Sequence, residues 1–392
     1  MKIKTLKNSK ARLCEIKTNH GTIKTPFFMP DATRGFVKLV DNSMLNKINI
    51  QAMVVNTLHL YLRPGIKVIK KAGGIHNFIN WDKPLLSDSG GFQVFSLIHK
   101  NTGLGKISDK GVVFKSPLDG SAHELTPEKA IQIQFDLGTD MIVCLDDCPP
   151  NGFKRKDLER SVERTILWAK RCRKEYDKQA MSRQQKPLFF AVIQGGMELD
   201  LRKKCVEELI AIGFDGYGFG GMPVDKHGNF LKEVLEFTVD LIPENSIRFA
   251  LGIGAPQDIM ECFKMGWDIF DCVIPTREAR HGKFFLFQRK KIFNFQFSIF
   301  KKIQNSKFKI PNSQSFYNAL NINNAKFSND FTAINKYSKL LELQQHSKAY
   351  LHYLLKLKDP VGQRMASINN LEFYMELMKL ITHSVERATR NA

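Results

Sequence analysis

The 392-residue chain lacks the cysteine patterns of disulfide frameworks and zinc knuckles. Its seven cysteines are scattered, with one Cys-x-x-x-Cys and no Cys-x-x-Cys, which predicts reduced thiols in a cytoplasmic protein. No segment approaches about 18 consecutive apolar residues, and the charged start is not followed by the apolar run of a secretory signal. These absences exclude a secreted disulfide scaffold and predict no membrane partner.

Acidic residues are also scarce, with 39 Asp and Glu against 59 Lys and Arg, a formal net charge of +20. A surplus of this size attracts phosphates at long range, so nucleic acid is the first partner to consider. A proteome rich in Lys, Asn, Ile and Phe would produce the same surplus, and composition alone leaves that alternative open.

Short apolar runs that end in small or acidic residues recur through the first two-thirds of the chain, mostly followed by helical patterns. Runs of this kind are typical of parallel strands buried on both faces. Eight such strands alternating with helices predict a (β/α)8 barrel, with a doubly wound open sheet as the alternative. The runs are FFMPDA from Phe27, MVVNT from Met53, LLSDSGG from Leu85, MIVCLDDC from Met141, LFFAVIQGG from Leu188, GYGFGG from Gly216, RFALGIG from Arg248 and IFDCVIPT from Ile269.

Helix starts can also be read between these runs. Thr126, Pro127 and Glu128 supply an N-cap, a proline at the first helical position and an acid in the first turn, and Pro256 precedes a similar helix. Barrel enzymes place their chemistry where the strands end. The polar and glycine residues at those ends are Asp88, Asp146, Gln194, Gly220, Gly221, Gly252, Gly254 and Asp271.

Asp88 leaves its strand into Ser89, Gly90 and Gly91, where missing Cβ atoms let a planar ligand approach the backbone, and Phe92 offers a face for stacking. The same residues also suit an ordinary turn. Asp146 and Asp147 are adjacent, so we expect only Asp146 to face the barrel mouth, which disfavours a metal pair. Together with Gln194 and the Gly221 backbone, these groups suit a purine-like heterocycle.

Asp271 is the second key carboxylate. Paired with Asp88, it forms the set of a retaining glycosidase, in which one carboxylate attacks the anomeric carbon and the other moves a proton; a strand-end Asp that caps a loop is the alternative. Cys272 is expected to point to the opposite face and pack. Arg277 and Arg280 follow, as recognition of phosphates or base edges requires.

The motifs SDSGGFQV, LDDC, IQGG, DGYGFGG, GIGAPQD and FDCVIPTREARHG occur in one order along the chain. In this the sequence resembles the tRNA-guanine transglycosylases, the queuine tRNA-ribosyltransferase family, over nearly its whole length. The resemblance implies an irregular (β/α)8 barrel over residues 1–286, a basic Phe/Lys-rich insertion over 287–319, and a C-terminal subdomain over 320–392. The insertion contains IFNFQFSIF, Ile292 to Phe300, a period-two strand pattern that either contacts nucleic acid or only covers the barrel.

The activity implied by the resemblance is exchange of guanine at the wobble position of GUN-anticodon tRNA for a 7-deazaguanine, without a cofactor. Asp271 would be the nucleophile and Asp88 the general acid/base. Phe92 and Leu251 would sandwich the base, although the family often has Tyr and Met there. The implied base-binding residues are Asp88, Ser89, Gly90, Gly91, Phe92, Asp146, Gln194, Gly221 and Leu251. The implied RNA-binding residues are Gly252, Ile253, Gly254, Ala255, Pro256, Gln257, Asp258, Thr276, Arg277, Glu278, Ala279 and Arg280.

The sequence departs from the family at its structural zinc site, which Cys-x-Cys-x-x-Cys and a later His normally form. Those positions fall on Ser338, Leu340, Leu343 and Asn369, so we expect no metal there and an apolar core instead. A homodimer, which that subdomain helps to form in the family, is correspondingly less supported.

Residues near the base pocket bear on which base is used. Cys148 and Val224 resemble the bacterial type, which uses 7-aminomethyl-7-deazaguanine (preQ1), and we favour preQ1 over queuine. A non-catalytic tRNA-binding accessory subunit is the other alternative, disfavoured because both Asp88 and Asp271 are present. A glycoside hydrolase is disfavoured by the three tryptophans and the basic rim.

Overall fold

A computed structural model describes residues 2–5, 9–150, 152–288 and 316–390. Its centre is an eight-stranded parallel sheet in the order β4-β14-β13-β12-β11-β10-β6-β5. A bridge between Asp31 and Val54 joins its two edge strands and closes the barrel. The strands are β4 (Phe27–Pro30), β5 (Met53–Val55), β6 (Leu85–Ser87), β10 (Met141–Val143), β11 (Leu188–Ile193), β12 (Gly216–Phe219), β13 (Ile247–Ala250) and β14 (Ile269–Cys272). All eight predicted strands and the predicted barrel are therefore confirmed.

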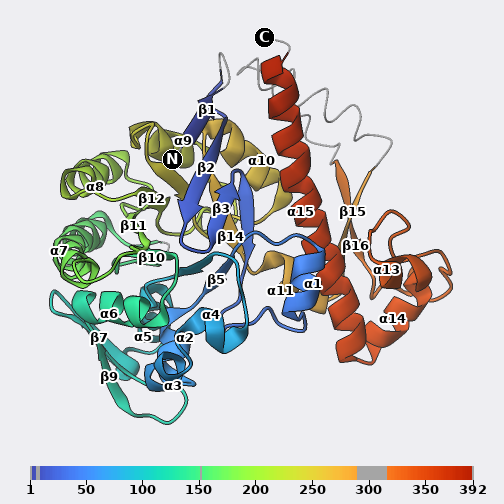
Figure 1. Cartoon of the computed structure of the whole chain (residues 1–392), viewed down its shortest axis with the longest axis horizontal. Helices are drawn as coiled ribbons and strands as arrows, with labels where there is room; N and C mark the ends of the chain where they lie inside the picture. Colours follow the sequence, from blue (N-terminus) through green and yellow to red (C-terminus); the bar gives the residue numbers. More distant parts are fainter. Residues whose placement is uncertain (1, 6–8, 151, 289–315, 391–392) are drawn as a thin grey trace.

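Helices form the outer layer of the barrel, as Figure 1 shows. Thr126 caps α6 through its hydroxyl, which accepts from the Lys129 backbone at 3.2 Å, and α10 begins at Pro256; both predicted starts are confirmed. The helices are α1 (Asn42–Lys47), α2 (Thr57–Leu62), α3 (Ile66–Lys71), α4 (Ile75–Ile79), α5 (Gly91–Lys100), α6 (Pro127–Leu137), α7 (Arg155–Ala180), α8 (Leu199–Ile212), α9 (Lys232–Leu241), α10 (Pro256–Met265) and α11 (Ile274–Arg280).

The barrel interior is packed with side chains. Phe27, Met141, Phe190 and Phe249 are among the buried residues there, and each large apolar side chain contributes about 1.5–3 kcal/mol by leaving water. Ile16 and Ile23 belong to the same cluster but come from an N-terminal sheet, β1 (Lys2–Thr5), β2 (Arg12–Thr18) and β3 (Gly21–Lys24). The β2–β3 hairpin therefore plugs one end of the barrel.

A second small sheet lies between α5 and α6, formed by β7 (Gly105–Ser108), β8 (Gly111–Lys115) and β9 (Ala122–Leu125). After α11, β15 (Lys283–Phe287) pairs antiparallel with β16 (Tyr317–Asn321). The predicted strand pattern over Ile292 to Phe300 lies outside the described residues. The division at 287–319 therefore stays a prediction.

The C-terminal part of the chain contains α13 (Leu341–Gln345), α14 (Lys348–Lys356) and α15 (Pro360–Arg390). The apolar stretch before Lys356 divides into two helices because Ser347 caps α14, its hydroxyl accepting from the Tyr350 backbone at 3.1 Å. Helix α15 runs along one side of the barrel and contacts α11, with β15, β16, α13 and α14 beyond it (Figure 1). None of the described helices has the length and apolar content needed to span a bilayer.

Candidate active site

The predicted polar residues meet at the carboxyl ends of the barrel strands. Asp88 follows β6, Asp146 lies beyond β10, and Asp271 is the second-to-last residue of β14. These carboxylates share one electrostatic environment, because Asp88 raises the pKa of both Asp146 and Asp271 by charge repulsion. Asp31, at the end of β4, has the same effect on Asp88 and Asp271. The barrel thus concentrates carboxylates in one region.

Asp88 is held by several donors. Asn56 Nδ2 donates to its Oδ2 at 2.6 Å, and the backbone amides of Thr57 and Gly90 donate to its Oδ1, each at 3.0 Å. Gly90 has φ +77°, a conformation that glycine adopts without strain. Burial outweighs these hydrogen bonds and raises the pKa of Asp88 to about 6. A carboxyl with this pKa can exchange a proton near neutral pH.

Asp271 accepts one hydrogen bond, from the backbone N–H of Gly252 at 2.9 Å. Its side chain stays partly accessible, although protein surrounds most of it. Burial raises its pKa to about 7, with further contributions from Asp31 and Asp88. With one partner and partial access, this carboxylate is free to attack an electrophile. The neighbouring thiol of Cys272 packs against the core, and burial raises its pKa to about 12, which excludes a neutral-pH thiolate.

Asp146 and Asp147 turn to different partners, so they do not form a metal pair. Asp146 accepts from Gln194 Nε2 at 2.6 Å, whereas Asp147 pairs with Arg164 Nη1 at 2.5 Å on α7. Burial raises the pKa of Asp146 to about 7. Among the residues that the structure describes, none forms a hydrogen bond to the buried Oε1 atom of Gln194. The unpaired amide oxygen beside a titratable carboxyl suits the donor edge of a heterocycle.

Two apolar side chains are the predicted stacking partners of the base. Phe92, on the first turn of α5, is 52% exposed, so its ring is available for stacking. Leu251 follows β13 and lies over Gly218, where an added Cβ would approach Leu251 Cδ1 to 2.1 Å. The glycine therefore makes room for Leu251.

The proposed RNA-contacting residues divide by exposure. Arg277 and Gln257 are exposed, whereas Ile253, Gly254, Thr276 and Ala279 are buried. Gln257 Oε1 accepts from the hydroxyl of Tyr317 at 2.6 Å, and the Gly254 carbonyl accepts from Tyr374. Residues 252–258 thus rest on β16 and α15, and α11, which carries residues 276–280, packs against α15. Ala255, Asp258, Glu278 and Arg280 have intermediate exposure, and Pro256 is buried at the start of α10.

Several residues that support the site were not predictable from the sequence. Asn56, Thr57 and Asp31 follow strands as the predicted groups do, but polar residues after a strand are common and gave no distinct pattern. Arg202 on α8 is fully buried and donates to the carbonyls of Gly196 and Gly220, at 2.7 and 3.1 Å, beneath the Gln194 edge. Nothing in a helical arginine indicates this role before the fold is known.

The positions of the family's zinc ligands are engaged otherwise. The hydroxyl of Ser338 donates to Glu372 Oε2 at 2.5 Å, and Asn369 Nδ2 donates to the Phe285 carbonyl at 2.9 Å. Leu340 and Leu343 are buried apolar side chains. One hydroxyl, one amide and two leucines do not fit a tetrahedral zinc ion.

A family model and individual relatives of this chain carry the same family description. The family model described as queuine tRNA-ribosyltransferase matches residues 7–391. A queuine tRNA-ribosyltransferase of Halothermothrix orenii is 42% identical over 379 residues, 97% of this chain and 91% of the relative. Proteins of the same name from Caldanaerobacter subterraneus and Shouchella clausii are 38% and 39% identical, each over 98% of this chain and over 92% and 91% of their own lengths.

Proposed function

This chain belongs to the queuine tRNA-ribosyltransferase family, and from that premise we propose that it exchanges guanine at the wobble position of GUN-anticodon tRNA for a 7-deazaguanine base. The chain is an enzyme, a pentosyltransferase of the tRNA-guanine transglycosylase type. The proposed details are the residues that perform the exchange, the incoming base and the tRNA set. We also propose that the enzyme acts in the cytoplasm.

In the proposed mechanism, Asp271 attacks C1′ of the wobble ribose. A carboxylate oxygen–carbon bond forms as the bond from C1′ to guanine breaks, and protonated Asp88 donates its proton to the leaving guanine, which leaves Asp88 ionised. The incoming base then loses its ring N–H proton to Asp88, and its nitrogen displaces Asp271 from C1′. The two inversions retain the configuration at C1′, and one N-glycosidic bond replaces another of similar energy. The observation that carries this mechanism is the pair of buried carboxylates at the strand ends, Asp88 held by the Asn56 amide and the Thr57 backbone and Asp271 by the Gly252 backbone, close enough for the charge of Asp88 to raise the pKa of Asp271.

The base would lie between Phe92 and Leu251, with its polar edge toward Asp146, Gln194 and the Gly221 backbone. Two observations on the described residues support this assignment. The exposed ring of Phe92 offers a face on which a flat base can stack, and the unpaired oxygen of Gln194 can accept a hydrogen bond from the edge of the base. The backbone of Ser89 to Gly91 would complete the pocket near Asp88.

We propose preQ1 as the incoming base, with queuine as the alternative. The thiol of Cys148 is largely enclosed beside Asp146 and Gln194, and burial raises its pKa to about 12. A small, uncharged side chain such as that of Cys148 suits the compact aminomethyl substituent of preQ1. The tRNA itself would be bound by the basic surface, with Arg277 as the exposed guanidinium close to Asp271 in the sequence.

We propose that the C-terminal subdomain holds no zinc, because its four ligand positions carry the side chains described above. Leu343 is fully buried, and Leu343→Ala should lower the free energy of unfolding by about 2–5 kcal/mol, as expected of a packed core. An anomalous-difference map recorded at the zinc edge would contradict this proposal by showing a peak beside Ser338 and Asn369. Whether the chain forms the family's homodimer stays a prediction.

The deciding experiment incubates the chain with GUN-anticodon tRNA and labelled guanine. The parent should incorporate label, and Asp271→Asn should not, while still binding tRNA in a filter assay. Asp157→Asn, in the first turn of α7 and apart from the proposed site residues, is the control and should behave as the parent. Denaturing gels should show a covalent protein–tRNA species for the parent alone. Tight tRNA binding with no exchange by the parent would instead favour a non-catalytic accessory subunit, and competition by preQ1 and queuine would decide the base.

A further inference from the structure

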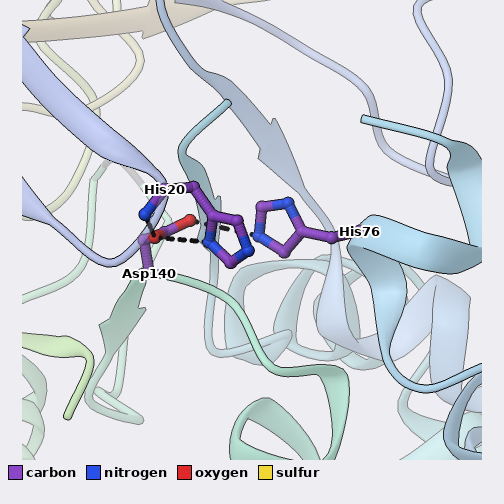
Figure 2. Close-up of side chains that lie close together, drawn as sticks. All are labelled: His20, His76 and Asp140. Carbon is purple, nitrogen blue, oxygen red and sulfur yellow. Dashed lines mark hydrogen bonds and ion pairs between the residues drawn. The ribbon is translucent and has the colours of Figure 1, made fainter. Parts of the chain in front are cut away.

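Two histidines and an aspartate converge at the barrel end opposite the active site. His20 lies in the turn between β2 and β3, His76 on α4, and Asp140 directly before β10. Asp140 thus precedes the strand whose other end leads to Asp146. Within the described ranges, this is the one group of three potential metal ligands whose donor atoms all lie within 4.8 Å of one another. Figure 2 shows both imidazoles beside the carboxylate.

The contacts are short and involve both carboxylate oxygens. His20 Nδ1 lies 2.9 Å from Asp140 Oδ1, and His76 Nε2 lies 3.1 Å from Asp140 Oδ2. The two rings stack with their centroids 3.6 Å apart. Bonds of about 2.0–2.2 Å to a tetrahedral zinc keep its ligand atoms roughly 3.3–3.5 Å apart. The two nitrogen–oxygen separations are thus close to those of a bound ion, and the His20 ring must swing out of the stack for both imidazoles to direct a nitrogen at the same ion.

The hydrogen bonding of His76 leaves the lone pair of its Nε2 atom directed at the Asp140 carboxylate. Its Nδ1 lies 2.9 Å from the carbonyl oxygen of Trp81, which can only accept, so Nδ1 carries the proton. Nε2 of the neutral ring is then an acceptor facing Asp140 Oδ2, another acceptor. This Nε2 atom is buried and has no hydrogen bond of good geometry, on a residue only 8% exposed. A cation between the two atoms, or a second proton on His76, resolves the conflict.

The surroundings resemble those of a metal-binding group. Metal-binding histidines commonly donate their other N–H to a backbone carbonyl, as His76 does to Trp81. Asp140 accepts from the backbone amides of His20 and Leu85, each at 2.9 Å, so its oxygens are fixed in place. Each oxygen also faces one of the two imidazoles.

We propose that His20, His76 and Asp140 bind one divalent transition-metal ion, with Zn²⁺ best suited to two imidazoles and a carboxylate. The side chain of His20 is 37% exposed, which provides an entry path and leaves a fourth position for water. The ion would attach the β2–β3 hairpin, which plugs the barrel through Ile16 and Ile23, to α4 and to the base of β10. The site is separate from the proposed transfer reaction and from the C-terminal subdomain.

The test uses full-length, tag-free chain stripped with EDTA and titrated with Zn²⁺ against a chromophoric chelator. The parent should take up one Zn²⁺, and His20→Ala and Asp140→Asn should weaken its affinity on the order of 100-fold or more. His383→Ala, which removes an exposed histidine of α15, is the matched control and should bind as the parent does. His20 lies at an exposed turn, so its variant is expected to fold, and circular dichroism checks this.

The visible spectrum of bound Co²⁺ provides a second, independent measurement of metal binding. The parent should give the visible absorption of a nitrogen- and oxygen-bound ion without a thiolate charge-transfer band, and His20→Ala should lose it. Zn²⁺ should also raise the thermal midpoint of the parent and leave that of His20→Ala unchanged. No uptake by the folded parent would overturn the proposal and identify the cluster as an imidazolium–carboxylate pair. Uptake unchanged in His20→Ala would also overturn it.

Discussion

Asn56 Nδ2 donates a hydrogen bond of 2.6 Å to Oδ2 of Asp88, while Asn56 Oδ1 caps α2 by accepting from the His59 backbone at 2.9 Å. One amide side chain thus fixes both the start of a helix and the orientation of the proposed acid/base. The transfer of a proton from the incoming base to Asp88 is therefore expected to depend on Asn56, a residue that does not itself contact the substrate.

Asn56→Ala should lower kcat for base exchange by about tenfold or more, since Asp88 loses a donor that stabilises its ionised form. The pKa of Asp88 should rise further, and the acid limb of the kcat profile should move to higher pH, whereas the acid limb of kcat/KM reports Asp271. Loss of the helix cap should also cost about 1 kcal/mol of stability. Asp41→Ala removes the cap of α1, remote from Asp88, and should cost similar stability with an unchanged profile. Equal profiles for both variants would contradict the positioning role.

The pH dependence of exchange should report Asp271. Attack on C1′ requires the ionised carboxylate, and its pKa is raised to about 7, so kcat/KM should fall as the pH drops below about 7. Asp31 contributes to this shift, so Asp31→Asn should lower the pKa of Asp271 and move the acid limb to lower pH. The amide can still accept the 2.7 Å hydrogen bond from the Thr33 backbone, which preserves the loop.

Asp82→Asn, an exposed change outside the carboxylate group, is the control for Asp31→Asn. Its profile should overlay that of the parent across the measured pH range. An acid limb that stays in place in Asp31→Asn would show that another group sets the pH dependence.

The stacking role of Phe92 can be tested separately from catalysis. Phe92→Ala should raise KM for the incoming base by about 5- to 150-fold, the effect of losing about 1–3 kcal/mol of aromatic–base stacking. Phe92→Tyr keeps the ring and should restore most of the affinity. Phe78→Ala removes a 40% exposed phenylalanine from α4 and should leave KM unchanged. An unaltered KM in Phe92→Ala would place the base elsewhere.

The barrel was predictable from sequence because each strand is an apolar run buried on both faces and ends in residues too polar to continue it. Asp88, Asp146 and Asp271 were predicted for the same reason. Arg202 and the group of His20, His76 and Asp140 were not, because their members come from separate segments that only folding brings together.

A buried ion pair should stabilise the end of the barrel that carries the β2–β3 hairpin. Arg12 donates to both oxygens of Asp268, at 2.9 and 2.5 Å, and both side chains are nearly inaccessible. Asp268→Ala would leave the Arg12 charge buried with only backbone carbonyls as partners, so the free energy of unfolding should fall by about 3–5 kcal/mol. The matched control is Asp200→Ala, which breaks an exposed pair with Arg155 and should cost less than about 1 kcal/mol. Urea denaturation of the two variants measures the difference, and equal costs would show that burial does not determine the strength of the Arg12–Asp268 pair.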